Sequence, residues 1–173
     1  FRSVGYTEEK GRKVFKPDGT YQKIAAVERH KNTGKIGVGI VKGFGLRGGA
    51  IASSVSHDSH NLIVIGDNDH DMYLAVQELL RTQGGYTLVE NGQVFDTLPL
   101  PIMGLMSDAG YEKVNEKLAR MIPKAHEMGI PEGFDPFITL SFMALPVIPE
   151  IRITPRGVYL TQEDRMIQSP FDR

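Results

Sequence analysis

The sequence predicts an α/β or α+β fold, with a mixed β-sheet, one Asn-Gly hairpin and two to three packing helices. Residues 86–90 and 93–98 are β-rich runs on either side of Asn91-Gly92, the strongest short signal for a hairpin. Residues 69–83 repeat apolar side chains at helical spacing. Other strand-like and helix-like runs are intermixed along the chain, so a sheet packed by helices accounts for the pattern.

The composition is that of an ordinary soluble domain. The chain has 173 residues, 40% hydrophobic and 24% charged, and we expect one domain over 1–173, with peripheral segments at 1–20 and 161–173. A net charge of -1 argues against a nucleic-acid or membrane surface. No apolar run approaches the roughly 18 to 20 residues that span a bilayer. The absence of cysteine excludes disulfides and thiolate metal sites and fits a cytoplasmic protein.

The first third of the chain predicts strands. Residues 2–20 are polar and indicate an irregular or edge element. Strands are then expected at residues 21–30, 36–41, 50–56 and 62–65. The third of these carries small side chains on one face, where another backbone or a ligand could approach closely. The fourth is an unbroken apolar run, typical of a buried strand.

Helix signals follow. Asn68 is a candidate N-cap for the helix at residues 69–83. A second helix is expected to open at Ser107 or Asp108, and Pro123 is expected to kink or end it.

A third helix and a short tail complete the expected fold. Asp135-Pro136 predicts an N-cap followed by proline at the first helical position, with a helix over residues 137–145. The tail from Ile151 is expected to hold one more short strand and then polar residues.

Residues 43–48 (GFGLRG) match the glycine spacing of dinucleotide-binding loops, and Asp67 lies about where a ribose-binding acid would sit. That mechanism needs a helix N-terminus directed at the phosphates, whereas residues 49–55 indicate a strand. We therefore expect a structural glycine-rich turn that opens no helix, with residues 50–56 extended.

A short run of acidic residues and a histidine opens the helix at 69–83. Together with Asp67, the residues Asp69, His70 and Asp71 could be taken for a metal cluster. Helix capping and compensation of the helix dipole explain them more simply.

Residues 53–61 (SSVSHDSHN) form the densest polar cluster, at a strand end where binding sites are often built. His57 and His60 could bind a metal if the backbone turns between them, because on an extended strand they would face opposite sides. Serine, histidine and aspartate also permit a nucleophilic triad, although adjacency in sequence does not produce triad geometry. The alternative is a polar turn whose side chains bond to local backbone.

Three segments, in order, resemble bacterial and archaeal adenine deaminases. They are residues 49–66 (GAIASSVSHDSHNLIVIG), 98–107 (LPLPIMGLMS) and 135–150 (DPFITLSFMALPVIPE). Order and spacing agree over about residues 23–158, most of the chain. The sequence is therefore similar to the C-terminal domain of this amidohydrolase family.

The resemblance implies the hydrolysis of adenine to hypoxanthine and ammonia, a reaction of purine salvage. It implies a divalent metal, Mn or Fe in a binuclear centre, in a (β/α)8 barrel that precedes this domain, and no metal in this chain. A chain of 173 residues cannot hold a barrel of about 250, so we expect the isolated chain to be inactive. The partners implied are the enzyme's own barrel domain, adenine and further copies in a homo-oligomer.

The resemblance also implies that the polar segment completes or covers the active site. We expect supporting catalytic roles for His57, Asp58 and His60, and substrate binding by Ser53, Ser54, Ser56 and Asn61. Adenine deamination transfers protons to a ring nitrogen and to the leaving ammonia, which imidazole and carboxylate groups can supply.

Two other functions stay open. The chain could be a non-catalytic nucleotide-binding or regulatory module that uses residues 43–48, or an oligomerisation module. A helix beginning at Gly48 with a bound phosphate would favour the first, and a large apolar face without a polar pocket would favour the second. A purine or metal beside His57 and Asp58 would favour the deaminase.

Overall fold

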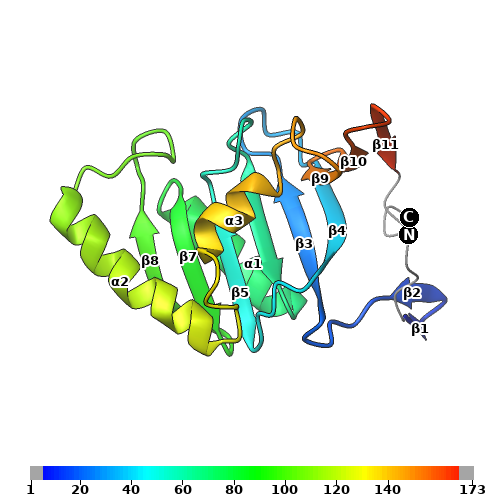
Figure 1. Cartoon of the computed structure of the whole chain (residues 1–173), viewed down its shortest axis with the longest axis horizontal. Coiled ribbons are helices and arrows are strands. Elements are labelled where there is room, and N and C mark those ends of the chain that lie inside the picture. The colour runs from blue at the N-terminus through cyan, green and yellow to red at the C-terminus, as the bar shows by residue number, and fades with distance from the viewer. Residues whose placement is uncertain (1–5, 168–173) are drawn as a thin grey trace.

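A computed structural model describes residues 6–167, in which a six-stranded sheet forms the centre of the molecule (Figure 1). The sheet has the order β4-β3-β6-β5-β7-β8. Its strands are β3 (Tyr21–Val27), β4 (Ile36–Lys42), β5 (Gly49–Ser53), β6 (Leu62–Gly66), β7 (Gly85–Glu90) and β8 (Gln93–Pro99). All of its pairings are antiparallel. The fold is thus α+β, and the expectation of a mixed sheet is wrong.

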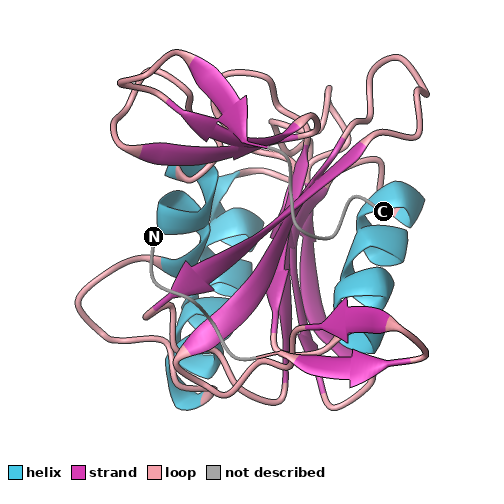
Figure 2. Cartoon of the chain, turned by 90° about the vertical axis from the view of Figure 1, so that its right-hand side faces the viewer, coloured by secondary structure: helices cyan, strands magenta, loops and turns pink. Residues whose placement is uncertain are grey.

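Helices cover both faces of this sheet (Figure 2). One face packs against α1 (Asp69–Arg81), and the other packs against α2 (Tyr111–Glu127) and α3 (Pro136–Phe142). Successive side chains of β3 point to opposite faces of the sheet. Ile24 therefore packs in the core beneath α2 and α3, and Ala25 packs in the core beneath α1.

Helix α1 begins and ends close to where the sequence predicts. The side chain of Asn68 accepts a hydrogen bond from the backbone amide of Asp71 at 2.8 Å, which satisfies one of the free donors of the first turn. The helix connects β6 to β7, and β5 lies between these two strands in the sheet. The helix is therefore a crossover above β5.

The strands β7 and β8 form an antiparallel hairpin, in which Glu90 pairs with Gln93. Asn91 and Gly92 lie between them with φ angles of 49° and 80°. Both residues occupy the left-handed region that a tight two-residue hairpin turn requires, and asparagine and glycine tolerate this conformation best.

Helix α2 differs from its prediction at both ends. It begins at Tyr111 rather than at Ser107 or Asp108, and Gly110 caps it without a side-chain hydrogen bond. Pro123 lies inside the helix, which continues to Glu127. Met121 and Ala125 are buried against the sheet on either side of this proline, so packing offsets the hydrogen bond that proline cannot donate.

Helix α3 follows its predicted cap, because Asp135 accepts hydrogen bonds from the amides of Phe137 and Ile138 at 2.8 and 2.9 Å. The helix ends at Phe142, three residues before the predicted end.

Two small sheets flank the central one. The N-terminal segment forms the hairpin β1 (Thr7–Glu9) and β2 (Arg12–Val14). The tail forms three strands, not one, in the order β11-β10-β9. They are β9 (Ile151–Thr154), β10 (Gly157–Leu160) and β11 (Arg165–Ile167). Each is only three or four residues long, too short for a periodic pattern to predict.

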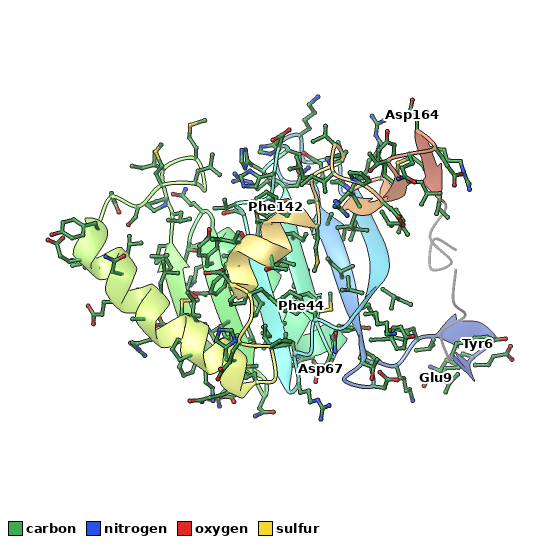
Figure 3. The ribbon with its side chains drawn as sticks, in the orientation of Figure 1. Tyr6, Glu9, Phe44, Asp67, Phe142 and Asp164 are labelled. Atoms are coloured by element: carbon green, nitrogen blue, oxygen red, sulfur yellow. The ribbon has the colours of Figure 1, made fainter. Side chains whose placement is uncertain are left out.

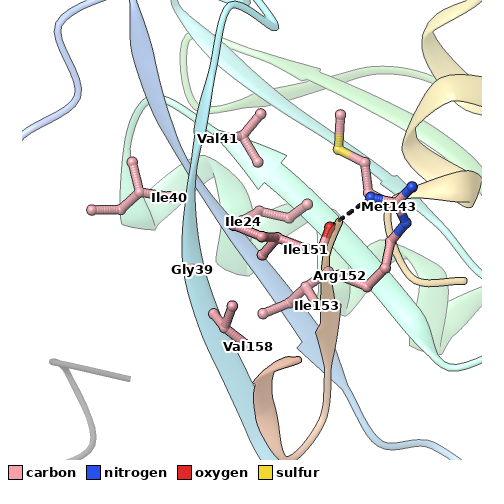
Figure 4. Close-up of a pocket in the computed structure, with 9 residues that line it drawn as sticks. All are labelled: Ile24, Gly39, Ile40, Val41, Met143, Ile151, Arg152, Ile153 and Val158. Atoms are coloured by element: carbon pink, nitrogen blue, oxygen red, sulfur yellow. Dashed lines mark hydrogen bonds between the residues drawn. The ribbon is translucent and has the colours of Figure 1, made fainter. Parts of the chain in front are cut away.

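A cavity of about 320 Å³ lies between the central sheet and the tail strands (Figure 4). Most of its lining is apolar, and Arg152 supplies the charged side chain in it. The guanidinium of Arg152 donates to the carbonyl oxygens of Ile151 and Pro149 at 2.6 and 2.7 Å. These bonds use two of the guanidinium nitrogens within the fold, and Nε is buried without a partner among residues 6–167.

Candidate functional site at the edge of the sheet

The glycine-rich loop is structural, as the sequence predicts. No helix follows residues 43–48; Gly49 opens β5 instead. The carboxylate of Asp67 accepts hydrogen bonds from the amides of Gly48 and Gly49 at 2.5 and 3.1 Å. The acid expected for a ribose is thus bound to the loop itself, which disfavours the dinucleotide interpretation.

The acidic side chains at the start of α1 also bond to other residues of the chain. Lys23 forms an ion pair with Asp69, and Asp71 accepts a hydrogen bond from the amide of Gly92 at 2.9 Å. Within residues 6–167, no group of three or more His, Cys, Asp or Glu side chains could hold a metal ion.

The polar segment, residues 53–61, joins β5 to β6 at one edge of the central sheet. The strand expected over residues 50–56 ends at Ser53, and the following residues form a bend and a turn. This departure from the extended prediction brings His57 close to His60, with 5.9 Å between their ring centroids.

The hydroxyl groups of two of the expected substrate-binding serines form hydrogen bonds with backbone groups instead. Ser53 is fully buried, and its Oγ accepts a hydrogen bond from the amide of Val55 at 2.9 Å. Ser54 is likewise fully buried; its Oγ accepts from the amide of Gly85 at 2.8 Å and donates to the carbonyl of Gly104 at 2.6 Å. These hydroxyls hold the end of β5 in place.

Asn61 and the residues beside it anchor the other end of the segment. The Oδ1 of Asn61 accepts a hydrogen bond from the amide of Arg29 at 3.3 Å. The Nε of Arg29 donates to the carbonyl of His60 at 2.5 Å, and Nε2 of His30 lies 2.7 Å from the carbonyl oxygen of Ser59. The segment is therefore tied to the chain that follows β3.

Within residues 6–167, no such hydrogen bonds with the backbone are formed by the side chains of Ser56, His57, Asp58 and His60. Ser56 Oγ and His60 Nδ1 are buried and have no hydrogen-bond partner in the part of the chain that the structure describes. The ring of His57 lies 5.3 Å from that of Phe142 at the end of α3, and Asp58 is exposed. Since buried polar groups are normally paired, each such atom calls for an explanation.

The environment favours a neutral imidazole at His60. Burial lowers the pKa of His60 below its ordinary value of 6.5, and the positive charges of His57 and Arg29 lower it further, whereas Asp58 raises it. A neutral ring at neutral pH can accept a proton.

Exposed apolar side chains lie on loops and a helix end near this polar segment. The carboxyl ends of β3, β5 and β8 meet at the same edge because these strands run in the same direction in the sheet (Figure 1). Phe142 lies at that edge as well (Figure 3). Large apolar residues exposed on the loops and the helix end there are Ile102, Met103, Met106, Phe142 and Val147, with Met103 at 75% and Val147 at 72%. Large exposed apolar side chains that gather in one place mark a surface that another part of a protein covers, and we call these five residues the apolar rim.

Sequence reasoning missed three contributors to this edge. Phe142 and Met103 lie inside segments that carry the family resemblance, so the resemblance gave a signal for both. Arg29 lies outside these segments, and no motif marks it.

Comparison with known proteins gives a consistent result. The family described as "Adenine deaminase C-terminal domain" matches residues 2–165. A relative named adenine deaminase from Desulfitobacterium hafniense is 58% identical over 154 residues, which cover 89% of this chain and 27% of that protein. Adenine deaminases from Nitratidesulfovibrio vulgaris and Bacillus subtilis are 54% and 49% identical, cover 84% of this chain, and are themselves covered to 25% and 26%. The chain thus spans about a quarter of the length of these curated relatives.

The helices give no sign of a membrane span. Within residues 6–167, none is both long and apolar enough to cross a bilayer.

Proposed function

The chain belongs to the adenine deaminase C-terminal domain family, and from this premise we propose that it completes the active site of an enzyme that hydrolyses adenine to hypoxanthine and ammonia. In this proposal the apolar rim packs against the enzyme's catalytic domain, and the polar segment faces the bound purine. The observation that carries the proposal is a pair of buried atoms in the polar segment, Ser56 Oγ and His60 Nδ1, which have no hydrogen-bond partner within residues 6–167.

The metal belongs elsewhere in this proposal. The side chains of residues 6–167 do not fit a metal centre, because no three potential ligands come together. We assign the divalent metal, Mn or Fe in a binuclear centre, to the catalytic domain of the longer protein. There it would supply the activated water that attacks the purine.

The polar segment would handle protons and orient the base. His60, neutral near pH 7 for the reasons given above, can accept a proton or hold one hydrogen bond from the purine. His57 can exchange protons with it through one water, since their centroids lie 5.9 Å apart. Asp58, exposed at the tip of the turn, can serve as a carboxylate partner for the leaving ammonia.

The competing functions receive less support. A nucleotide-binding module would need residues 43–48 to open a helix, whereas a strand follows them. Assembly into a homo-oligomer and a cytoplasmic location stay predictions.

Alanine substitutions in the full-length enzyme test the proposal. We expect His57→Ala and His60→Ala each to lower kcat/KM by about 100-fold or more, the typical contribution of a positioned acid or base. Asp58→Ala should lower it as well. His70→Ala is the matched control, because His70 is an exposed histidine in the first turn of α1 and should stay within about threefold of wild type.

Metal content and folding are measured on every variant. A loss of activity with the metal retained supports a direct role in substrate binding or proton transfer. A loss accompanied by metal loss makes these residues supports of the metal centre. If His57→Ala, Asp58→Ala and His60→Ala all match the His70→Ala control, the segment is structural and the proposal fails.

A further inference from the structure

Arg29 connects two loops that are far apart in the sequence. It follows β3 and is half-buried. Its Nε donates to the carbonyl of His60 at 2.5 Å and its Nη2 donates to the carbonyl of Met103 at 2.7 Å. One planar side chain thus binds both the polar segment and the loop of residues 101–107, which leads from β8 toward α2.

Hydrogen bonds to carbonyl oxygens hold the guanidinium of Arg29. Within residues 6–167 no salt bridge joins it to a carboxylate. The carboxylate of the neighbouring Glu28 bonds to backbone amides instead, because its Oε1 accepts hydrogen bonds from the amides of His30 and Lys31 at 2.6 and 2.7 Å. Burial lowers the pKa of Arg29, which means that the charged form is disfavoured at this place. The two hydrogen bonds to carbonyl oxygens offset this cost of burying the cation.

The loop that Arg29 binds is shaped to receive it. Gly104 has a φ of 75°, and a Cβ added to it would lie 2.7 Å from both Nη1 and Nη2 of Arg29. The guanidinium therefore packs on a glycine where a larger residue would collide with it. Ser54 Oγ donates to the carbonyl of this same glycine at 2.6 Å, a second link between the polar segment and the loop.

We propose that Arg29 is a positioning residue, which fixes the polar segment and the 101–107 loop in one relative arrangement at the edge of the sheet. This inference rests on the proposed function, because that arrangement sets the place of His60 and of the apolar rim against the purine and the catalytic domain. Lysine cannot replace the arginine, since a single ammonium does not span both carbonyl groups in one plane.

Hydrogen exchange of the 173-residue chain tests the inference without reference to activity. In Arg29→Ala and in Arg29→Lys, amides of residues 54–61 and of 101–107 should both exchange faster than in wild type. Arg81→Ala is the control, because Arg81 is an exposed arginine on α1 that pairs with Glu78. Unchanged exchange in either loop overturns the inference.

A second variant displaces the guanidinium without removing it. Gly104→Ala should speed exchange in both loops, whereas Gly110→Ala should not. Gly110 has a similar φ of 83°, but its nearest neighbour would lie 3.5 Å from an added Cβ, an ordinary contact. Equal effects of the two variants would attribute the change to backbone strain and would count against the inference.

Activity of the full-length enzyme gives the functional readout. Arg29→Ala should lower kcat by about 100-fold, the effect of a displacement near 1 Å in an active site, and added guanidinium ion should restore part of that loss. Failure of guanidinium to restore activity overturns a positioning role for Arg29. If exchange rises in both loops while His57→Ala, Asp58→Ala and His60→Ala all match the His70→Ala control, the proposed function fails and the structural role of Arg29 stands.

Discussion

The carboxylate of Asp67 accepts a hydrogen bond from the backbone amide of Gly48 at 2.5 Å. It also accepts one from Gly49, so it closes the glycine-rich loop onto the first residue of β5. We predict that Asp67→Ala lowers the free energy of unfolding by about 1–3 kcal/mol, because two amides lose a charged acceptor. Urea unfolding measures this.

Asp58→Ala is the control for that measurement, since Asp58 is exposed and its replacement should change stability by less than about 0.5 kcal/mol. Equal stability of Asp67→Ala and wild type, together with saturable binding of a dinucleotide that the substitution abolishes, would revive the nucleotide-binding interpretation.

Gly45 and Gly43 form a matched pair in the same loop. Both have positive φ, 86° and 81°, but an added Cβ would lie 2.4 Å from the carbonyl oxygen of Gly129 at Gly45 and would meet nothing within 4 Å at Gly43. We predict that Gly43→Ala costs about 1 kcal/mol, from backbone strain alone, and that Gly45→Ala costs about 3 kcal/mol or more. Chemical denaturation of both variants gives the difference. Equal losses would mean that the close approach to Gly129 is not retained in solution.

His60 should make stability depend on pH. Its folded-state pKa is lowered, first by burial and then by His57 and Arg29, with a smaller contribution from His30 and an opposing one from Asp58. Between the lowered pKa and the unfolded value of about 6.5, the unfolded state binds more protons, so stability falls as the pH falls through this window.

The comparison of wild type with His60→Asn isolates that effect, because asparagine tolerates the positive φ of 48° at this position. Unfolding free energies at about pH 7.5 and about pH 5.5 should differ less in the variant than in wild type. An identical difference in both proteins would show that His60 is not protected from protonation.

The 173-residue chain by itself should not deaminate adenine. Residues 6–167 bring together no set of three metal-binding side chains, and the chain spans about a quarter of its curated relatives. Ammonia release from adenine should stay at the uncatalysed level with or without added Mn²⁺. Metal-dependent turnover at an enzyme-like rate of about 1 s⁻¹ or more would contradict this.

Local sequence signals predicted much of the fold. Asn68 and Asp135 cap α1 and α3 as expected, because capping depends on neighbouring residues only. Pro123 was misleading for a physical reason: its effect on a helix depends on what the helix packs against, and Met121 and Ala125 bury that part of α2. The antiparallel sheet was missed because strand order depends on long-range pairing, which periodicity does not encode.

The candidate site could be predicted only in part. The polarity of residues 53–61 predicts a site there. The sequence does not show which of these side chains bond to the backbone and which are left without a partner. Ser53 and Ser54 are used by the main chain, whereas Ser56 Oγ has no partner within the described residues. Arg29 was missed because its partners are carbonyl groups, which every residue carries.

A crystal structure of the full-length enzyme with hypoxanthine bound would show whether the polar segment reaches the purine. We expect Ser56 Oγ or a ring nitrogen of His57 or His60 to lie within about 3.5 Å of the purine, or of one water bound to it. We also expect Met103 and Phe142 to be buried against the catalytic domain. A purine site more than about 10 Å from residues 53–61, beyond the reach of one bridging water, with that segment facing solvent, would show that the segment takes no part in the active site.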